Sequence, residues 1–304
     1  MKRISVVIVN YNTRDLLEHC LNRLLASRVD RPISIFVVDN GSRDGSVDLV
    51  RDAFPDVELI ASSRNLGYAA ANNLALQRIL ERWRDAGKPA GNSALLLNTD
   101  CFVEPDSLRI TADFLDSNDD AGVVGPKLVL RDGTLDLACR RSFPRPVNAL
   151  WKLTGFSLLF PDSRRFASYN LTYLDEDQTV EVDSVVGAYM MVRIDAIDET
   201  GLMDDSFFMY GEDLDWAYRI KQNGWRVYYH PATTVLHYKG ATSSRQSYRL
   251  IVEFYRAMYL FHRKHYAPDL FFAVNWLITA GIIGRGLFAL VRNLFRPARS
   301  KKVG

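Results

Sequence analysis

The position of Asp100 in this 304-residue chain indicates that it could bind a metal ion. It follows the apolar run 95–97 through Asn98 and Thr99, where a buried strand would end. A hard divalent cation prefers oxygen ligands and commonly bridges a carboxylate and the phosphates of a nucleotide. One carboxylate here could therefore hold Mg²⁺ or Mn²⁺ if a diphosphate supplies further ligands. The alternative is an aspartate that caps the following turn.

A second segment crowds three acids into four positions. Glu212, Asp213 and Asp215 lie beside Trp216. Burying like charges together is costly unless a cation or a reacting proton uses them. One of these carboxylates could act as a general base on a hydroxyl nucleophile, in a geometry that parallels inverting glycoside hydrolysis. The alternative is an acidic helix N-terminus, which the helix dipole favours.

Asp39 and His237 each end a short apolar run. The Asp39 carboxylate could accept a hydrogen bond from a nucleoside base or ribose, although the adjoining Asn40-Gly41 also suits a local turn. A lone histidine at the end of a strand is more often a hydrogen-bonded core residue than a ligand.

No GxGxxG motif follows the first apolar run, which argues against a dinucleotide dehydrogenase. The phosphates of a bound nucleotide would then need a metal ion.

The elements that must position these residues alternate along the N-terminal third. The expected strands are 4–9, 34–38, 57–61 and 94–97, and the expected helices are 14–27, 46–53 and 70–84. This alternation predicts an α/β fold with a mostly parallel central sheet flanked by helices. Ligands bind at the carboxyl ends of such strands, so Asn10, Asn12, Asp39 and Asp100 should meet at one edge.

Composition excludes several classes of protein. A hydrophobic content of 48% supports a packed core rather than a disordered chain. Three cysteines without CxxC spacing argue against a disulfide framework or a structural zinc site, and favour a reducing compartment such as the cytoplasm. Residues 140–180 carry three prolines and show no clean period, which predicts a mobile or partner-facing insert.

The C-terminal tail is first apolar and then basic. Residues 270–284 are nearly all apolar, and Arg285 ends this run short of the roughly 20 residues that span a bilayer. All six charged residues of 270–304 are basic, which suits anionic lipid headgroups better than nucleic acid. We expect residues 270–296 to lie at the inner face of a plasma membrane, with no nucleic-acid partner. A buried amphipathic helix that closes the domain is the alternative.

Six segments in order resemble the family 2 glycosyltransferases, specifically their rhamnosyltransferase-like branch. They are 7–12, 37–42, 65–68, 97–100, 211–216 and 237–238, and the resemblance covers roughly residues 3–265. It implies an inverting sugar transfer from a nucleotide diphosphate donor by a GT-A fold. Residues 1–125 would bind the nucleotide sugar, residues 126–265 the acceptor, and residues 266–304 would form a helical, membrane-associating extension.

The resemblance also implies roles for single residues. Asp213 would be the catalytic base, and Asp100 would bind Mg²⁺ or Mn²⁺ as the last residue of a DxD motif that reads Asn98-Thr99-Asp100 here. His237, 24 residues after Asp213, matches a histidine that ligates the metal in related galactofuranosyl transferases. The donor-binding residues implied are Asn10, Asn12, Asp39, Asn65, Gly67, Asn98 and Thr99, and the acceptor-binding residues are Gly187, Glu212 and Trp216.

The resemblance favours dTDP-rhamnose as the donor, a glycan or polyprenyl-linked acceptor, and a role in cell-surface polysaccharide synthesis. A UDP-hexose donor is the alternative. A sugar nucleotidyltransferase would carry a glycine-rich, basic phosphate loop near the first strand, which residues 10–13 lack. The non-enzymatic alternative is an inactive, membrane-associated nucleotide-sugar-binding protein. The presence of Asp39, Asp100, Asp213 and His237 together argues against it.

Overall fold

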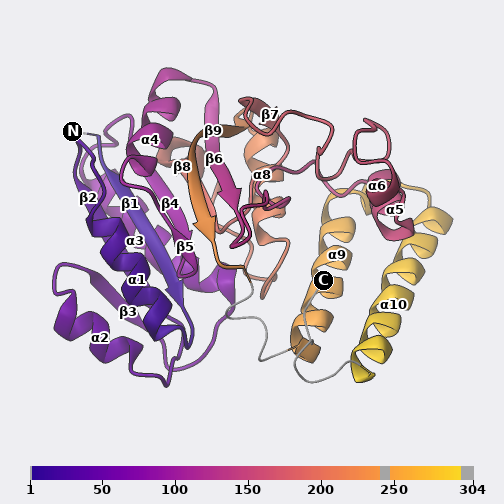
Figure 1. Ribbon diagram of the computed structural model, residues 1–304, viewed down its shortest axis with the longest axis horizontal. Coiled ribbons are helices and arrows are strands. Elements are labelled where there is room, and N and C mark those ends of the chain that lie inside the picture. The colour runs from indigo at the N-terminus through magenta and orange to yellow at the C-terminus, as the bar shows by residue number, and fades with distance from the viewer. Residues whose placement is uncertain (1, 240–246, 296–304) are drawn as a thin grey trace.

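One mixed β-sheet flanked by helices forms the centre of the molecule (Figure 1). This computed structural model describes residues 2–239 and 247–295. Within these ranges the sheet has nine strands, of which eight follow the order β3-β2-β1-β4-β8-β6-β9-β5 and β7 pairs with β9. The strands are β1 (Ile4–Asn10), β2 (Ile33–Asp39), β3 (Glu58–Ala61), β4 (Ser93–Asn98), β5 (Cys101–Phe102), β6 (Ala121–Val129), β7 (Val180–Val182), β8 (Tyr189–Arg193) and β9 (Arg226–His237).

The helices bury their apolar sides. In α1, for example, Leu17, Cys20, Leu21 and Leu24 are buried at the spacing that aligns side chains on one face of a helix. The helices are α1 (Arg14–Leu25), α2 (Ser46–Ala53), α3 (Tyr68–Asp85), α4 (Ser107–Ser117), α5 (Pro146–Thr154), α6 (Phe156–Leu159), α7 (Ile194–Thr200), α8 (Glu212–Gln222), α9 (Ser247–His265) and α10 (Phe272–Leu294), with a 3₁₀ turn at Ala267–Asp269.

The N-terminal half of the sheet is parallel, as the sequence predicts. Strands β3, β2, β1 and β4 pair in parallel, and the run Ala94–Leu97 in β4 is buried throughout, as expected of a strand covered on both faces. The register places Asn10 beside Asp39 and Val9 beside Asn98. Polar residues of three strands therefore end at the same edge.

The second half of the sheet adds antiparallel pairs. Strand β8 runs antiparallel to β4 and β6, whereas β9 is parallel to β6. The short β5 pairs antiparallel with the end of β9, which sets Cys101 opposite His237. The expected division after residue 125 falls inside β6 (Ala121–Val129), so both halves contribute to one strand.

The insert 140–180 contains two short helices. Pro146 begins α5 at its first turn instead of interrupting a helix, because its missing N–H would have no partner there. On these helices and in the loop that follows, Trp151, Phe156, Phe160 and Phe166 form an aromatic cluster in which neighbouring ring centroids are 5.0–6.3 Å apart. Leu158 and Leu159 remain 81% and 71% exposed.

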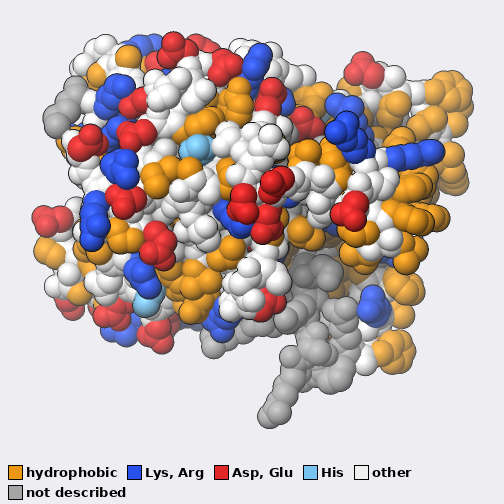
Figure 2. All heavy atoms as spheres, turned by 45° about the horizontal axis from the view of Figure 1, so that its top comes forward, with side chains coloured by type: hydrophobic (Ala, Val, Ile, Leu, Met, Phe, Trp, Pro, Cys, Tyr) orange, Lys and Arg blue, Asp and Glu red, His pale blue; other side chains and the backbone are white. Residues whose placement is uncertain are grey.

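Helices α9 and α10 pack side by side, outside the sheet (Figure 1). Gly286 allows close contact, since a Cβ there would lie 3.2 Å from Tyr255. The apolar run continues past Arg285, which lies inside the helix, and α10 is long and apolar enough to cross a membrane by length and composition alone. Its outer face exposes Phe272, Trp276 and Phe288, and Figure 2 shows hydrophobic side chains gathered on this side of the molecule.

Gly67 joins the loop that follows β3 to the segment that precedes α8. Its φ of +90° suits glycine, and an added Cβ would lie 2.4 Å from the carbonyl oxygen of Phe208. The next residue, Tyr68, donates its backbone N–H to that same oxygen at 2.7 Å. The close approach of the two backbones therefore depends on the missing side chain.

We predict that Gly67→Ala lowers the free energy of unfolding by about 2–5 kcal/mol, through backbone strain and overpacking. Gly133→Ala is the matched control, because Gly133 also has a positive φ, +81°, but its Cβ would meet nothing within 4 Å. That control should lose only about 1–2 kcal/mol. Denaturant unfolding of both variants measures the difference, and equal losses would contradict the packing argument.

Candidate active site

Asp39 and Asn10 form the buried centre of the edge at which β1, β2 and β4 end. Asn10 donates its amide to Asp39 Oδ2 at 2.9 Å, and the backbone N–H of Ser42 donates to Asp39 Oδ1 at 2.9 Å. The side-chain oxygen of Asn10 accepts from the hydroxyl of Thr13, which lies 3.0 Å from the hydroxyl of Thr99. Side chains from the ends of β1, β2 and β4 thus form one hydrogen-bonded group.

Two loops build the outer part of this edge. Asn12 has φ +52°, and its side-chain oxygen accepts from the backbone N–H of Arg43 at 2.8 Å. Asn65 shapes its own loop: its side-chain oxygen accepts from the side chain of Asn40 and from the backbone N–H of Gly67. The structure therefore places the expected donor residues along one rim, where Asn65 and Gly67 have clear local roles.

Asp100 and His237 meet beside this edge, as the sequence predicts. His237 Nε2 lies 3.6 Å from Asp100 Oδ1, and both side chains are buried. With Cys101, they bring three potential ligand atoms within 4.8 Å of one another. A carboxylate oxygen and an imidazole nitrogen suit a divalent cation such as Mn²⁺, whereas the thiol is a softer ligand. This corner is a candidate site for a divalent metal.

Asp136 is a member of this corner that the sequence analysis missed. Its Oδ2 lies 2.8 Å from His237 Nδ1, and its Oδ1 accepts from Lys239 Nζ at 2.7 Å. Burial alone would raise the pKa of Asp136, but His237 and Lys239 hold it well below its usual range. Burial likewise opposes the charge of His237, yet Asp100 and Asp136 raise its pKa to about 9. A carboxylate on Nδ1 leaves Nε2 directed at Asp100.

Asp213 lies at the first turn of α8 and is held by three N–H donors. Arg141 Nη2 donates to its Oδ2 at 2.7 Å, and the backbone N–H of Gly187 donates to the same oxygen at 3.0 Å. The backbone N–H of Leu214 donates to Oδ1 at 2.8 Å. Arg141, 72 residues earlier in the chain, is a second residue that the sequence analysis missed. These donors fix the orientation of the carboxylate.

Glu212 lies next to Asp213 and forms no ion pair with the residues that the structure describes. It is 7% exposed, and its Oε2 has no hydrogen-bond partner among the described residues. Burial and the neighbouring Asp213 charge raise the pKa of Glu212, which favours a neutral carboxyl group. Nearby, the Tyr68 hydroxyl donates to the carbonyl of Gly187 at 2.7 Å. Glu212 and Gly187 thus both border the Asp213 carboxylate, and their role in acceptor binding stays a prediction.

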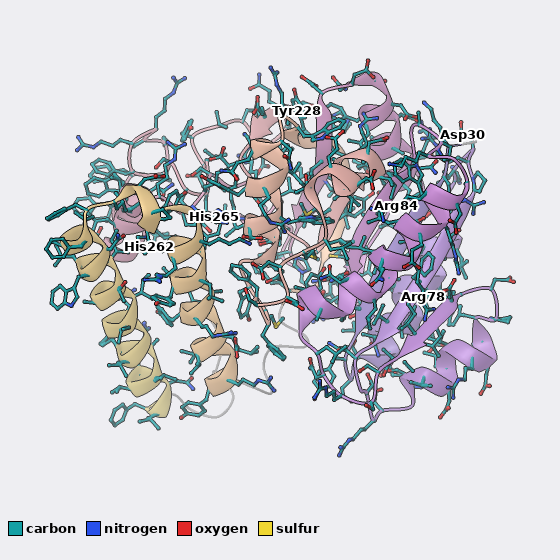
Figure 3. The ribbon with its side chains drawn as sticks, turned by 180° about the vertical axis from the view of Figure 1, so that it is seen from behind. Asp30, Arg78, Arg84, Tyr228, His262 and His265 are labelled. Atoms are coloured by element: carbon teal, nitrogen blue, oxygen red, sulfur yellow. The ribbon has the colours of Figure 1, made fainter. Side chains whose placement is uncertain are left out.

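Asp215 and Trp216, the other two residues of this segment, are buried in the packing around α8. Asp215 is fully buried between α8 and α9, where His265 points toward α8 (Figure 3). Burial opposes its charge, but His265, Lys264 and Arg219 together lower the pKa of Asp215 to about 2. Trp216 is also fully buried and donates its indole N–H to the carbonyl of Gly201. The structure does not bring Trp216 to the site, so we do not propose it as an acceptor ligand.

A Rossmann-like edge, a carboxylate–histidine corner and a buried carboxylate on the opposing half define the class of GT-A sugar transferases. The family described as "Glycosyltransferase like family 2" matches residues 2–251, and the chain belongs to this family. It is a glycosyltransferase of α/β fold, with a central sheet flanked by helices and a C-terminal helical extension, as the sequence predicts.

Curated relatives match three quarters of the chain or more. The N-acetylglucosaminyl-diphospho-decaprenol L-rhamnosyltransferase of Mycobacterium tuberculosis (strain ATCC 25618 / H37Rv) is 26% identical over 99% of this chain and 96% of that protein. The rhamnosyltransferase WbbL of Escherichia coli (strain K12) is 25% identical over 77% of this chain and 83% of that protein. The resemblance to rhamnosyltransferases is therefore confirmed.

Solved structures share the fold. S. aureus TarS 1–349 in complex with UDP has a TM-score of 0.56 and 17% identity, over 95% of this chain and 72% of that chain. The mannosyltransferase PcManGT of Pyrobaculum calidifontis, in complex with GDP-Man and Mn²⁺, has a TM-score of 0.53 and 17% identity, over 98% of this chain and 77% of that chain.

We predict that Asp136→Asn weakens Mn²⁺ binding by about 10–100-fold, because the carboxylate that orients His237 loses its charge. Isothermal titration with Mn²⁺ in the presence of dTDP measures the affinity without any turnover. Asp132→Asn is the control, since Asp132 is exposed on the same segment and pairs only with Thr134 among the described residues. Wild-type affinity in Asp136→Asn, together with lost affinity in Asp100→Asn, would show that Asp136 does not position the ligand.

Proposed function

We propose that this glycosyltransferase transfers rhamnose from dTDP-rhamnose to a glycan linked to a lipid diphosphate, with inversion at the anomeric carbon. The names of the mycobacterial and E. coli relatives support the sugar, and the decaprenol in the mycobacterial name supports a lipid-linked acceptor in polysaccharide synthesis. The observation that carries the chemistry is the Asp213 carboxylate, buried and oriented by Arg141 and Gly187.

Asp213 is the proposed base of a single displacement. A carboxylate oxygen of Asp213 takes the proton of the acceptor hydroxyl as the hydroxyl oxygen forms its bond to the anomeric carbon. The bond from this carbon to the diphosphate breaks, and its electron pair leaves with the diphosphate. The N–H donors on Asp213 fix the orientation of its carboxylate before the acceptor binds.

Asp100 and His237 are the proposed ligands of the metal ion, Mg²⁺ or Mn²⁺. When bound, the ion would supply Lewis-acid stabilisation of the leaving diphosphate. Asn98 in place of the first acid of the motif removes one negative charge from this corner, so we infer that the donor's phosphates complete the site. The proposed donor-binding residues are Asn10, Asn12, Asp39, Asn65, Gly67, Asn98 and Thr99.

Glu212 and Gly187 are proposed to border the acceptor. A neutral carboxyl group at Glu212 could donate a hydrogen bond to a sugar oxygen through its unpartnered Oε2, whereas a carboxylate there would repel Asp213. Gly187 leaves space beside the base, since a Cβ there would approach Tyr68 at 3.4 Å and Asp213 at 3.6 Å. Their proximity to Asp213 supports this assignment.

The function test compares donors and a base variant. Wild-type protein should release dTDP from dTDP-rhamnose in a metal-dependent manner and faster than it releases UDP from UDP-glucose. Asp213→Asn should reduce transfer by 10²-fold or more, because an amide cannot accept the acceptor's proton. Asp205→Asn, an exposed acid upstream of the same helix, is the control. Near-wild-type transfer by Asp213→Asn would refute its role as the base, and nucleotide-sugar binding without any turnover would favour the inactive binding protein.

We also propose that α10 lies at the inner face of the plasma membrane. Its exposed Trp276 and Phe288, with exposed Arg285 and Arg292, combine an apolar face with cations that suit anionic headgroups. The same composition supports a peripheral, cytoplasmic enzyme. The expected basic residues 296–304 lie outside the described residues.

The double variant Trp276→Ser/Phe288→Ser should bind anionic phospholipid vesicles much less than wild type in a sedimentation assay, because two large apolar side chains no longer enter the interface. Leu25→Ser is the matched control, since Leu25 is 57% exposed on α1, away from this surface. Unchanged sedimentation of the double variant would contradict a membrane role for α10.

A further inference from the structure

A chain of contacts connects Lys152, in the insert 140–180, to the proposed base Asp213. Its Nζ lies 4.2 Å from the centroid of the Tyr169 ring, and the Tyr169 hydroxyl interacts electrostatically with Arg141. Arg141 in turn donates to Asp213 at 2.7 Å. Helix α5, which carries Lys152, is held to the segment that follows Arg141, because the Asn148 side chain donates to the carbonyl of Phe143 at 2.7 Å.

Lys152 differs from Arg141 and Lys239, whose charges act on it, because it pairs with no acid among the described residues. Arg141 pairs with Asp213, and Lys239 pairs with Asp136, whereas no carboxylate among the described residues lies within 4.0 Å of Lys152 Nζ. Lys152 is open to solvent, yet the surrounding protein and the charges of Arg141 and Lys239 lower its pKa to about 8. A bound anion would relieve this repulsion.

The surface beyond Lys152 is apolar. Val147 and Leu150 on the same helix are 62% and 49% exposed, and α6 follows with Leu158 and Leu159. A ligand with an anionic group at Lys152 can therefore continue along an apolar surface. The start of α5 also lies near α9, since the rings of Phe143 and Phe261 are 6.3 Å apart.

We propose that Lys152, with Tyr169 and Arg141, binds the diphosphate of a lipid-linked acceptor. This inference rests on the proposed function and adds the subsite that recognises the acceptor's anionic link. The donor's diphosphate belongs at Asp100 and His237, at the end of β9. Lys152 instead adjoins the base through Arg141, so an acceptor sugar placed at Asp213 would direct its diphosphate toward α5 and its lipid toward α6.

Binding to a soluble prenyl diphosphate tests this subsite without turnover. Farnesyl diphosphate, inorganic pyrophosphate and dTDP are each titrated into wild-type protein and into Lys152→Gln by calorimetry. Farnesyl diphosphate should bind the variant about tenfold more weakly, since a charge-assisted contact is lost. Pyrophosphate should bind wild type more weakly than farnesyl diphosphate, and dTDP should bind both proteins equally. Lys152→Arg should restore the prenyl diphosphate affinity.

Arg164→Gln is the matched control, because Arg164 is an exposed basic residue of the same insert with no ion pair among the described residues, and it should bind like wild type. An equal loss of dTDP affinity in Lys152→Gln would assign the lysine to the donor, and an unchanged farnesyl diphosphate affinity would remove the subsite. Either result overturns the proposal. Absent dTDP binding by wild type would instead refute the proposed function, so the two failures are distinguishable.

Kinetics with two acceptors supply the second measurement. Lys152→Gln should raise KM for a glycan on a prenyl diphosphate by about tenfold and leave KM unchanged for the same glycan on a neutral octyl group. A merely structural role would change both values or lower kcat with both acceptors, and that result would contradict the proposal.

Discussion

The site depends on the burial of several carboxylates within one region, which is unfavourable unless each negative charge is compensated. Asp136 is compensated by His237 and Lys239, Asp213 by Arg141 and two backbone N–H groups, and Asp39 by Asn10 and the N–H of Ser42. These donors come from segments far apart in the chain. The contacts that compensate the buried acids therefore also connect distant segments within each half of the fold.

The parallel half of the fold could be predicted because its signal is local. Apolar β-branched runs end in Asn10, Asp39 and Asp100, and the register of parallel strands brings these ends together. Strand β6 carries no such signal, since Gly122, Gly125 and Pro126 interrupt it. The structure explains the two glycines, because a Cβ at Gly122 would lie 2.7 Å from Trp225 and a Cβ at Gly125 would lie 2.8 Å from Val185.

Arg141 and Asp136 could not be predicted from the sequence, because nothing in their neighbourhood marks them. Each lies in the irregular segment after β6, and each gains its role only through a partner about 70 or more residues away. Asp213 and Asp215 show the reverse difficulty. They are two residues apart in one acidic run, yet one faces Gly187 and the other is buried against α9 by Lys264 and His265. Only tertiary packing places the two carboxylates in different surroundings.

The pairing of β5 with β9 links the metal corner to the mechanics of the sheet. Cys101 lies opposite His237 in this pairing, and β5 is only two residues long. A shift of the register by one residue would turn His237 to the other face of the sheet. An ion shared by Asp100 and His237 would hold these two strands together, so its binding would be thermodynamically linked to the stability of the β5–β9 pair.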